Sequence, residues 1–421
     1  MKLGFAKAEI TPPAGLELGG YAGYRPNCGV HDPLFCKTIL LEQAGKQYAL
    51  IVLDLMCADE SLCEKIAAAV EHLGISGERL IVSAIHSHAA PAGVIGGVGA
   101  LAQINTAIVP ENAAFAEYMQ RVVSAAADAC MEAAQSAEPF VMRAAQGTMP
   151  PVGSERHTGA QPKGILTAAE FRLQSGKNLI LYNFPCHPTV LSAANLFVSA
   201  DFAGQIEKYL DADLTVFANG AAGDISTRFT RKASSFEECD RMGALAAAYV
   251  RDLLEPLPFE EPQPLRGKRL QVILAARKVQ PVEQARKQLE EATLRWQQAV
   301  EAGLDAGQIR ILKSYAEGAG VNLEFAQNMV GIAEFTVPVT VFRFTGLNFA
   351  TVPGEFYSTL LPENTAAICY ANGYYRYIAD ENAYAAGHYE ALAAIVARGS
   401  GEKLSNTIRQ MLDQIKMEEK L

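Results

Sequence analysis

Residues 79–88 are Arg79-Leu80-Ile81-Val82-Ser83-Ala84-Ile85-His86-Ser87-His88, an apolar run that ends in two histidines. A short run rich in leucine, isoleucine and valine is typical of a buried β-strand. Residues two apart on extended backbone face the same way, so the imidazoles of His86 and His88 can point at one centre. One histidine could then bind a metal while the other moves protons. The alternative is that they are hydrogen-bonded histidines of the core.

Outward from this stretch, short β-branched or aromatic runs alternate with alanine-rich stretches, which predicts a mixed α/β fold. The expected strands are residues 37–41, 48–53, 79–85, 141–146, 169–173, 178–184, 214–218, 337–344, 347–352 and 368–371. The expected helices are residues 61–72, 113–134, 203–209, 235–254, 355–361, 388–396 and 404–417.

Residues 281–321 differ in composition from the rest, being rich in Gln, Glu, Arg and Ala and interrupted by Gly303 and Gly307. This composition predicts a helical hairpin inserted into the α/β body. The proline-rich residues 255–264 are the best candidate linker, but apolar runs resume from Ala333. We therefore expect residues 1–421 to form a single domain.

The bulk composition limits the classes of function. The chain has 421 residues, 50% hydrophobic and 19% charged, with a formal net charge of −10, which disfavours nucleic acid as a partner. The eight cysteines include no CxxC pair and are expected to be reduced. No export signal or stretch of ~20 apolar residues stands out, so we expect a cytoplasmic protein without stable membrane insertion. A small-molecule substrate is expected, and a homo-oligomer is possible.

Two further strand endings carry residues that could bind a metal. His187 follows the apolar residues 178–184 and lies between Pro185 and Pro188, and Glu355 follows Pro353-Gly354. Two histidines and one carboxylate form the ligand set of several hydrolytic zinc sites, which leave one position open for water. The alternatives are that His187 is a loop residue and that Glu355 is a favourable charge in the first turn of a helix.

Two glycine-rich stretches complete the candidate site. Residues 217–227, Phe-Ala-Asn-Gly-Ala-Ala-Gly-Asp-Ile-Ser-Thr, predict a loop that cradles an anion or a substrate. No GxSxG pattern surrounds Ser226, so a serine-hydrolase triad lacks its usual signature. Residues 93–99 have only weak dinucleotide-like glycine spacing, and we interpret them as a mobile lid over the site.

Taken in order, these motifs resemble the neutral/alkaline ceramidase family of zinc-dependent amidases. The resemblance spans most of the chain. It is carried by residues 4–13 with 20–24, residues 86–91, residues 187–189 with 200–204, residues 219–226, and residues 353–356 followed by 372–390.

The resemblance implies two packed mixed β-sheets flanked by helices and a zinc ion bound by His86, His187, Glu355 and Tyr377. It further implies that Tyr389 hydrogen-bonds the oxyanion and that His88 lies near the reacting water. Ser226 would lie beside the substrate, and Arg156 would contact the scissile amide.

Departures from the family pattern concern the substrate. His-Ser-His-Ala-Ala-Pro replaces the expected His-Thr-His-Ser-Gly-Pro, and we expect neither a C-terminal immunoglobulin-like domain nor an export signal. We therefore expect a zinc-dependent hydrolase that cleaves an amide (N-acyl) bond in a soluble small molecule rather than in ceramide. The alternatives are a metal-dependent esterase or lactonase, a sugar-amide hydrolase, and a non-catalytic ligand-binding relative.

Overall fold

The strand expected before His86 is present in the computed structural model, which describes residues 1–75, 77–97, 101, 112–162, 164–304 and 306–419. It forms β5 (Leu80–Ala84), which is mostly buried and pairs in parallel with β4 (Lys46–Leu53). Backbone hydrogen bonds to neighbouring strands and burial of the apolar side chains together make this segment part of the core.

Three four-stranded sheets form the body, and each is mixed, with two antiparallel pairings and one parallel pairing. The first sheet contains, in spatial order, β1 (Lys2–Glu9), β3 (Phe35–Gln43), β4 and β5. The second contains β11 (Leu214–Asn219), β9 (Asn178–Phe184), β8 (Ile165–Leu173) and β6 (Phe140–Thr148). The third contains β13 (Arg266–Ala275), β14 (Glu334–Phe344), β15 (Leu347–Val352) and β17 (Thr365–Cys369).

Short two-stranded pairings tie loops to these sheets. They are β2 (Gly29–Val30) with β10 (Phe197–Val198), β7 (Ser154–Glu155) with β12 (Ile225–Ser226), and β16 (Glu355–Phe356) with β18 (Tyr377–Ile378). The helix expected over residues 355–361 is therefore wrong. That segment is β16 followed by the 3-10 turn η4 (Ser358–Leu360), because parallel pairing with β18 overrides its local helical pattern.

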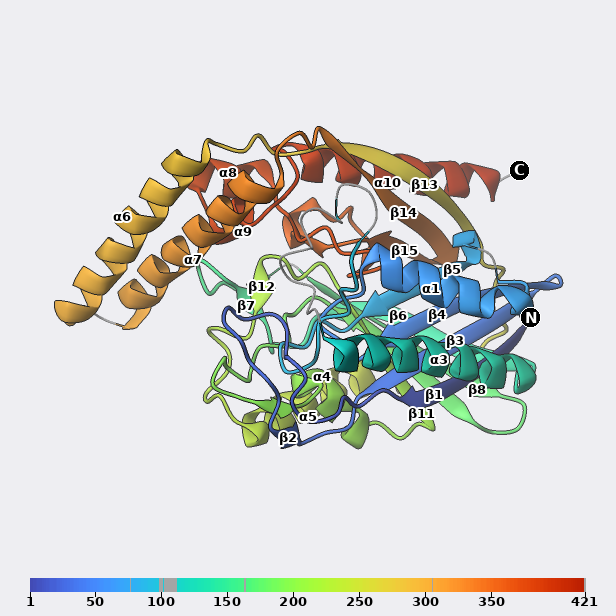
Figure 1. Ribbon diagram of the computed structural model, residues 1–421. Helices are drawn as coiled ribbons and strands as arrows, with labels where there is room; N and C mark the ends of the chain where they lie inside the picture. The colour runs from blue at the N-terminus through green and yellow to red at the C-terminus, as the bar shows by residue number, and fades with distance from the viewer. Residues whose placement is uncertain (76, 98–100, 102–111, 163, 305, 420–421) are drawn as a thin grey trace.

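A different helical layer covers each sheet (Figure 1). Helix α3 (Ala113–Gln135) packs on the first sheet and contacts α1 (Glu60–Val70), α5 (Phe236–Leu254) packs on the second, and α10 (Ser400–Glu418) packs on the third. The remaining helices of the described chain are η1 (Glu71–Leu73), η2 (Gly77–Arg79), α4 (Asp201–Gln205), η3 (Ile206–Tyr209), α6 (Val282–Glu301), α7 (Ala306–Asn328), α8 (Glu381–Ala386) and α9 (Tyr389–Leu392).

The faces of the three sheets that carry no helix turn toward one another. Strand β11 of the second sheet contacts β4 and β5 of the first sheet and β17 of the third. Ala218, Phe349 and Ile368 belong to the small apolar cluster buried between the sheets. The mixed α/β fold with helices outside is confirmed, and the strands are shared among three large sheets.

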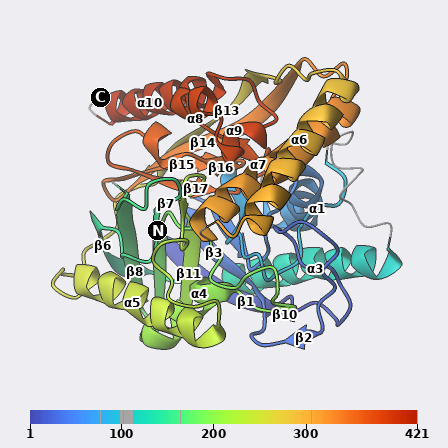
Figure 2. The same ribbon diagram turned by 90° about the vertical axis from the view of Figure 1, so that its left-hand side faces the viewer.

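Helices α6 and α7 lie side by side in both views (Figures 1 and 2), and Figure 1 shows them projecting together from the body. They occupy the stretch expected to form an inserted hairpin, and α7 extends beyond it to Asn328. The inner end of α7 packs on α9. Among the described helices, none combines the length and apolarity needed to cross a membrane.

Candidate metal centre

His86 leaves the end of β5 in a strained conformation. Its φ is 71°, a left-handed value that is costly for a residue with a Cβ and that clusters at functional sites. Its Nδ1 lies 2.7 Å from the carbonyl oxygen of Met56, and its ring stacks on Tyr370 with centroids 4.0 Å apart. Because a carbonyl oxygen only accepts, Nδ1 carries the proton, and Nε2 presents a lone pair to the site.

His187 follows β9 and is oriented in the same manner. Its Nδ1 donates a hydrogen bond of 2.6 Å to the carbonyl oxygen of Ala222, so its Nε2 also presents a lone pair to the site. The side-chain amide of Asn219 donates to the carbonyl oxygens of Ile85 and Cys186, at 2.9 and 3.1 Å. These carbonyls belong to the residues immediately before the two histidines, so Asn219 fixes both strand ends relative to each other.

Glu355 lies in β16, just beyond the end of β15 of the third sheet, and faces the two histidines. Its Oε2 lies 2.9 Å from Nε2 of His187 and 3.5 Å from Nε2 of His86, and its Oε1 accepts a hydrogen bond of 2.6 Å from Tyr374. Each large sheet thus supplies one of the three residues at a strand end, where rigid backbone aims side chains accurately.

The electrostatics of this trio fit a bound cation. Burial lowers the pKa of His187 to about 4, so its ring is neutral at pH 7. Two imidazole lone pairs therefore face a carboxylate oxygen, an arrangement that repels unless a cation lies among them. Backbone carbonyls that orient ligand histidines are a recurrent feature of metal sites.

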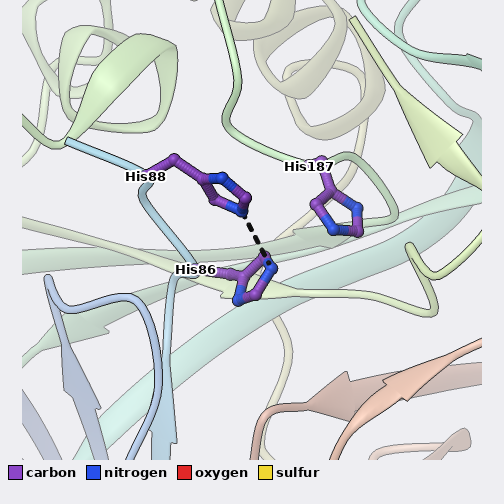
Figure 3. A group of neighbouring side chains, drawn as sticks. All are labelled: His86, His88 and His187. Atoms are coloured by element: carbon purple, nitrogen blue, oxygen red, sulfur yellow. Dashed lines mark hydrogen bonds between the residues drawn. The ribbon is translucent and has the colours of Figure 1, made fainter. Parts of the chain in front are cut away.

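His88 lies on the cleft side of this trio. Its Nε2 is 3.3 Å from Nε2 of His86 (Figure 3), and one nitrogen of each of His86, His88 and His187 falls in a group that could hold a metal. Burial and the neighbouring histidines hold the pKa of His88 well below its usual range. Gly20 packs against the ring so closely that a Cβ there would lie 2.4 Å from the Cγ of His88, and Tyr21 packs edge-on against it.

Tyr377 reaches the site through β18, whose register places it opposite Glu355. Its ring is roughly parallel to that of His187, with centroids 6.4 Å apart, and its hydroxyl accepts a hydrogen bond of 3.0 Å from Arg156. Burial raises the pKa of Tyr377 well above its usual value, and the charge of Arg156 opposes that rise. The guanidinium also contacts Glu390 at 3.1 Å, so Arg156 is held between two oxygens.

A cleft of about 510 Å³ opens over these residues. Its wall includes His86, His88, Glu355, Tyr374, Tyr377, Tyr389, Arg376, Tyr21, Val321 and Glu324. Tyr389 packs edge-on against Tyr377 with ring centroids 5.9 Å apart, and burial raises its pKa to about 12, so its hydroxyl remains a donor. The side chains of His86, His88, Glu355, Tyr377 and Tyr389 therefore share one cleft.

No protein-family model and no curated protein sequence matches the chain. Two solved structures do match it in fold. The crystal structure of neutral ceramidase from Pseudomonas aeruginosa superposes with a TM-score of 0.73 and 15% sequence identity, covering 97% of this chain and 73% of that one. A ceramidase complexed with C2 gives a TM-score of 0.70 and 15% identity, covering 99% of this chain and 75% of that one. The chain has a neutral ceramidase-like fold.

Two glycine-rich features expected at the site lie beside it, and most of their residues do not line the cleft. Ser226 is buried in β12, where its hydroxyl accepts from the backbone N–H of Arg228, and neither it nor any other residue of 219–226 lines the cleft. The backbone carbonyls of Ala222 and Ile225 in this loop contact Nδ1 of His187 and orient its ring.

The glycine-rich stretch after residue 92 also has a structural use. The backbone N–H groups of Ile95, Gly96 and Gly97 all donate to Asp59 Oδ2 at 2.8–3.0 Å. Val94 lines the cleft. Residues 98 and 99 of the expected lid lie outside the described part of the chain.

Sequence reasoning missed three side chains that support the site. Tyr370 stacks on His86, Tyr374 donates to Glu355, and Glu390 accepts from Arg156, His157 and Tyr357. The available signal was the density of tyrosine in residues 370–377, Tyr-Ala-Asn-Gly-Tyr-Tyr-Arg-Tyr, directly after an apolar run. No comparable sequence pattern marks Glu390, because the residues that donate hydrogen bonds to it are distant from it in the sequence.

Proposed function

We propose that this protein is a zinc-dependent hydrolase that cleaves an amide (N-acyl) bond in a soluble small molecule. The observation that carries the proposal is the convergence of the Nε2 atoms of His86 and His187 on one oxygen of Glu355, beside a cleft. Two nitrogens and a carboxylate with access to substrate are the ligand set of hydrolytic zinc centres. The ceramidase-like fold supports the choice of an amide bond.

His86, His187, Glu355 and Tyr377 would hold the ion. When bound, zinc would act as a Lewis acid, activating water and polarising the scissile carbonyl. Arg156 lies 3.0 Å from the hydroxyl oxygen of Tyr377, so its positive charge favours the phenolate form that a tyrosine ligand requires.

Hydrolysis forms a bond from the water oxygen to the acyl carbon and breaks the bond from that carbon to nitrogen. We assign His88 to accept the proton of the attacking water and return it to the leaving amine, because a neutral imidazole borders the cleft there. Tyr389 donates a hydrogen bond to the oxygen that develops negative charge. The products are a carboxylic acid and an amine.

A polar substrate is favoured by the outer wall of the cleft. Helix α7 contributes Val321 and Glu324, and Glu324 pairs with Arg376 at 3.0 Å. Glu17 adds another carboxylate to the lining. A lipid tail packed against these charged side chains would remove their water without replacing its hydrogen bonds. This wall therefore suits a polar substituent of the substrate better than a lipid tail.

The test combines metal analysis with a substrate panel. Wild type should contain about one zinc per chain, and His86→Ala and Glu355→Ala should contain little.

The substrate panel should include soluble N-acyl amines, N-acyl amino acids, N-acyl sugars, esters and lactones, with ceramide for comparison. Hydrolysis of the amides supports the proposal. Cleavage of esters or lactones alone would replace the amide assignment, and full zinc occupancy without turnover would point to a ligand-binding protein. Absence of metal from wild type would refute the metal centre.

A further inference from the structure

A second hollow lies at the opposite end of the strands from the histidines. It has a volume of about 320 Å³ and is bordered by all three large sheets. Its apolar wall includes Tyr48, Leu50, Ile81, Leu181, Phe342 and Phe344. Arg79 borders this cavity just before β5, whereas His86 follows β5, and seven extended residues span on the order of 20 Å. The cavity is therefore separate from the metal centre.

The three sheets close on one another toward the metal centre but remain apart here. Ala218 and Ala371 are buried in the core between the sheets, while Leu50, Ile81 and Leu181 at its edge are only partly buried. Aliphatic side chains left partly uncovered in a concave space favour an apolar occupant.

Basic groups surround the mouth of the cavity. Lys46, Arg79, Lys268 and Arg269 border it, against the single carboxylate of Glu78. Lys268 pairs with Glu418, outside the cavity lining.

The two arginines at the mouth have no carboxylate partner within salt-bridge distance among the described residues. Arg79 donates to the carbonyl oxygen of Gly74 and Arg269 to that of Gly77. The Nε atoms of both arginines are buried and lack a hydrogen-bond acceptor in the described part of the chain. A buried donor without an acceptor is costly, and a carboxylate is the natural partner of a guanidinium.

We propose that this cavity binds a fatty acid, with its chain between the sheets and its carboxylate at Arg79 and Arg269. The inference does not depend on the proposed hydrolysis.

Displacement of a fluorescent fatty-acid probe by decanoate, decanol and decylamine tests the proposal. Decanoate should displace the probe from wild type at least ten-fold more effectively than decanol, and decylamine should be weaker still. Equal displacement by decanoate and decanol would overturn the assignment, as would failure of the probe to bind.

Variants locate the bound chain. Ile81→Trp should fill the cavity and weaken decanoate binding at least ten-fold, with Leu50→Phe as a smaller change should the first variant fail to fold. The matched control is Leu270→Trp, at a residue that is 48% exposed and outside the cavity lining.

The double variant Arg79→Gln with Arg269→Gln should weaken the binding of decanoate but leave the binding of decanol unchanged. Glu355→Gln, in the metal centre, should bind decanoate like wild type. Loss of binding in Glu355→Gln but not in Ile81→Trp would place the ligand in the cleft and overturn the proposal.

Discussion

Two groups of the same residue types lie on either side of Arg156, and only one has the geometry of a metal centre. The first consists of His86 and His187 facing Glu355, with His88 beside them. The second consists of His157, His388 and Glu390, which also offer ligand atoms close together. Composition and proximity alone do not distinguish them.

Orientation and charge compensation separate the two groups. In the first, backbone carbonyls fix the Nδ1 atoms, so both Nε2 lone pairs point at the carboxylate of Glu355, which forms no ion pair with a lysine or arginine among the described residues. In the second, the rings of His157 and His388 stack in parallel with centroids 3.5 Å apart, so their nitrogens do not converge on one point. Glu390 already accepts from Arg156, His157 and Tyr357. A metal centre therefore requires an uncompensated carboxylate as well as converging lone pairs.

Removing a histidine from each group gives the largest expected contrast. His187→Ala should lose most of the bound zinc and reduce hydrolysis by ~10³-fold or more, because several kcal/mol of transition-state stabilisation disappear. His388→Ala should keep its zinc and most of its activity. Metal analysis and initial rates measure both. Equal zinc loss in the two variants would show that the second group also binds metal.

Glu390→Gln should have the next largest effect. Burial would raise the pKa of this carboxyl group, but the hydrogen bond from His157 and the charge of Arg156 lower it to about 2, so Glu390 is ionised at neutral pH and holds Arg156 beside Tyr377. Losing such a supporting charge typically reduces activity ~10- to 100-fold. We expect kcat to fall by that amount while the zinc content stays near wild type. Zinc loss as complete as in His187→Ala would instead make Glu390 a ligand.

Tyr374→Phe removes the one side-chain hydrogen bond to Oε1 of Glu355 among the described residues. The carboxylate would then be less firmly oriented, and zinc affinity should fall by ~10-fold, as measured by competition with a chelator. Tyr375→Phe is the matched control, because that hydroxyl donates to the carbonyl oxygen of Thr336, away from the metal centre. A similar loss of affinity in both variants would indicate general loosening of residues 370–377.

Substitution of Glu60 should have the smallest effect. The environment of its carboxyl group differs from those of Glu355 and Glu390. Glu60 belongs to neither group of possible metal ligands, and burial raises its pKa to about 8. The folded state binds this proton more tightly than the unfolded state, so stability should fall as pH rises from about 4.5 to 8. Glu60→Gln should flatten that slope and increase stability at pH 8 by about 1 kcal/mol, a figure reduced for partial exposure. Urea unfolding at pH 4.5 and 8 measures the difference. An unchanged slope would mean that Glu60 is well solvated.

The sequence alone determined the mixed α/β class and the approximate positions of most long strands and helices. Apolar runs and alanine-rich periodic stretches are local properties, so 178–184 and 113–134 closely match β9 and α3. It also singled out His86, His88, His187 and Glu355, because each stands at or just past an apolar run. The resemblance to ceramidases added Tyr377 and Tyr389, which line the same cleft.

Only the tertiary structure decided how these residues are oriented. Glu355 lies in a short strand rather than a helix because it pairs with Tyr377, and Asn219 holds the two histidine strands together through bonds to backbone carbonyls. Whether a carboxylate is compensated, as Glu390 is, or faces lone pairs, as Glu355 does, depends on side chains far away in the sequence. The apolar cavity likewise exists only where three sheets meet. Local sequence governs backbone preference and burial, whereas lone-pair direction, charge compensation and cavity shape arise from long-range packing.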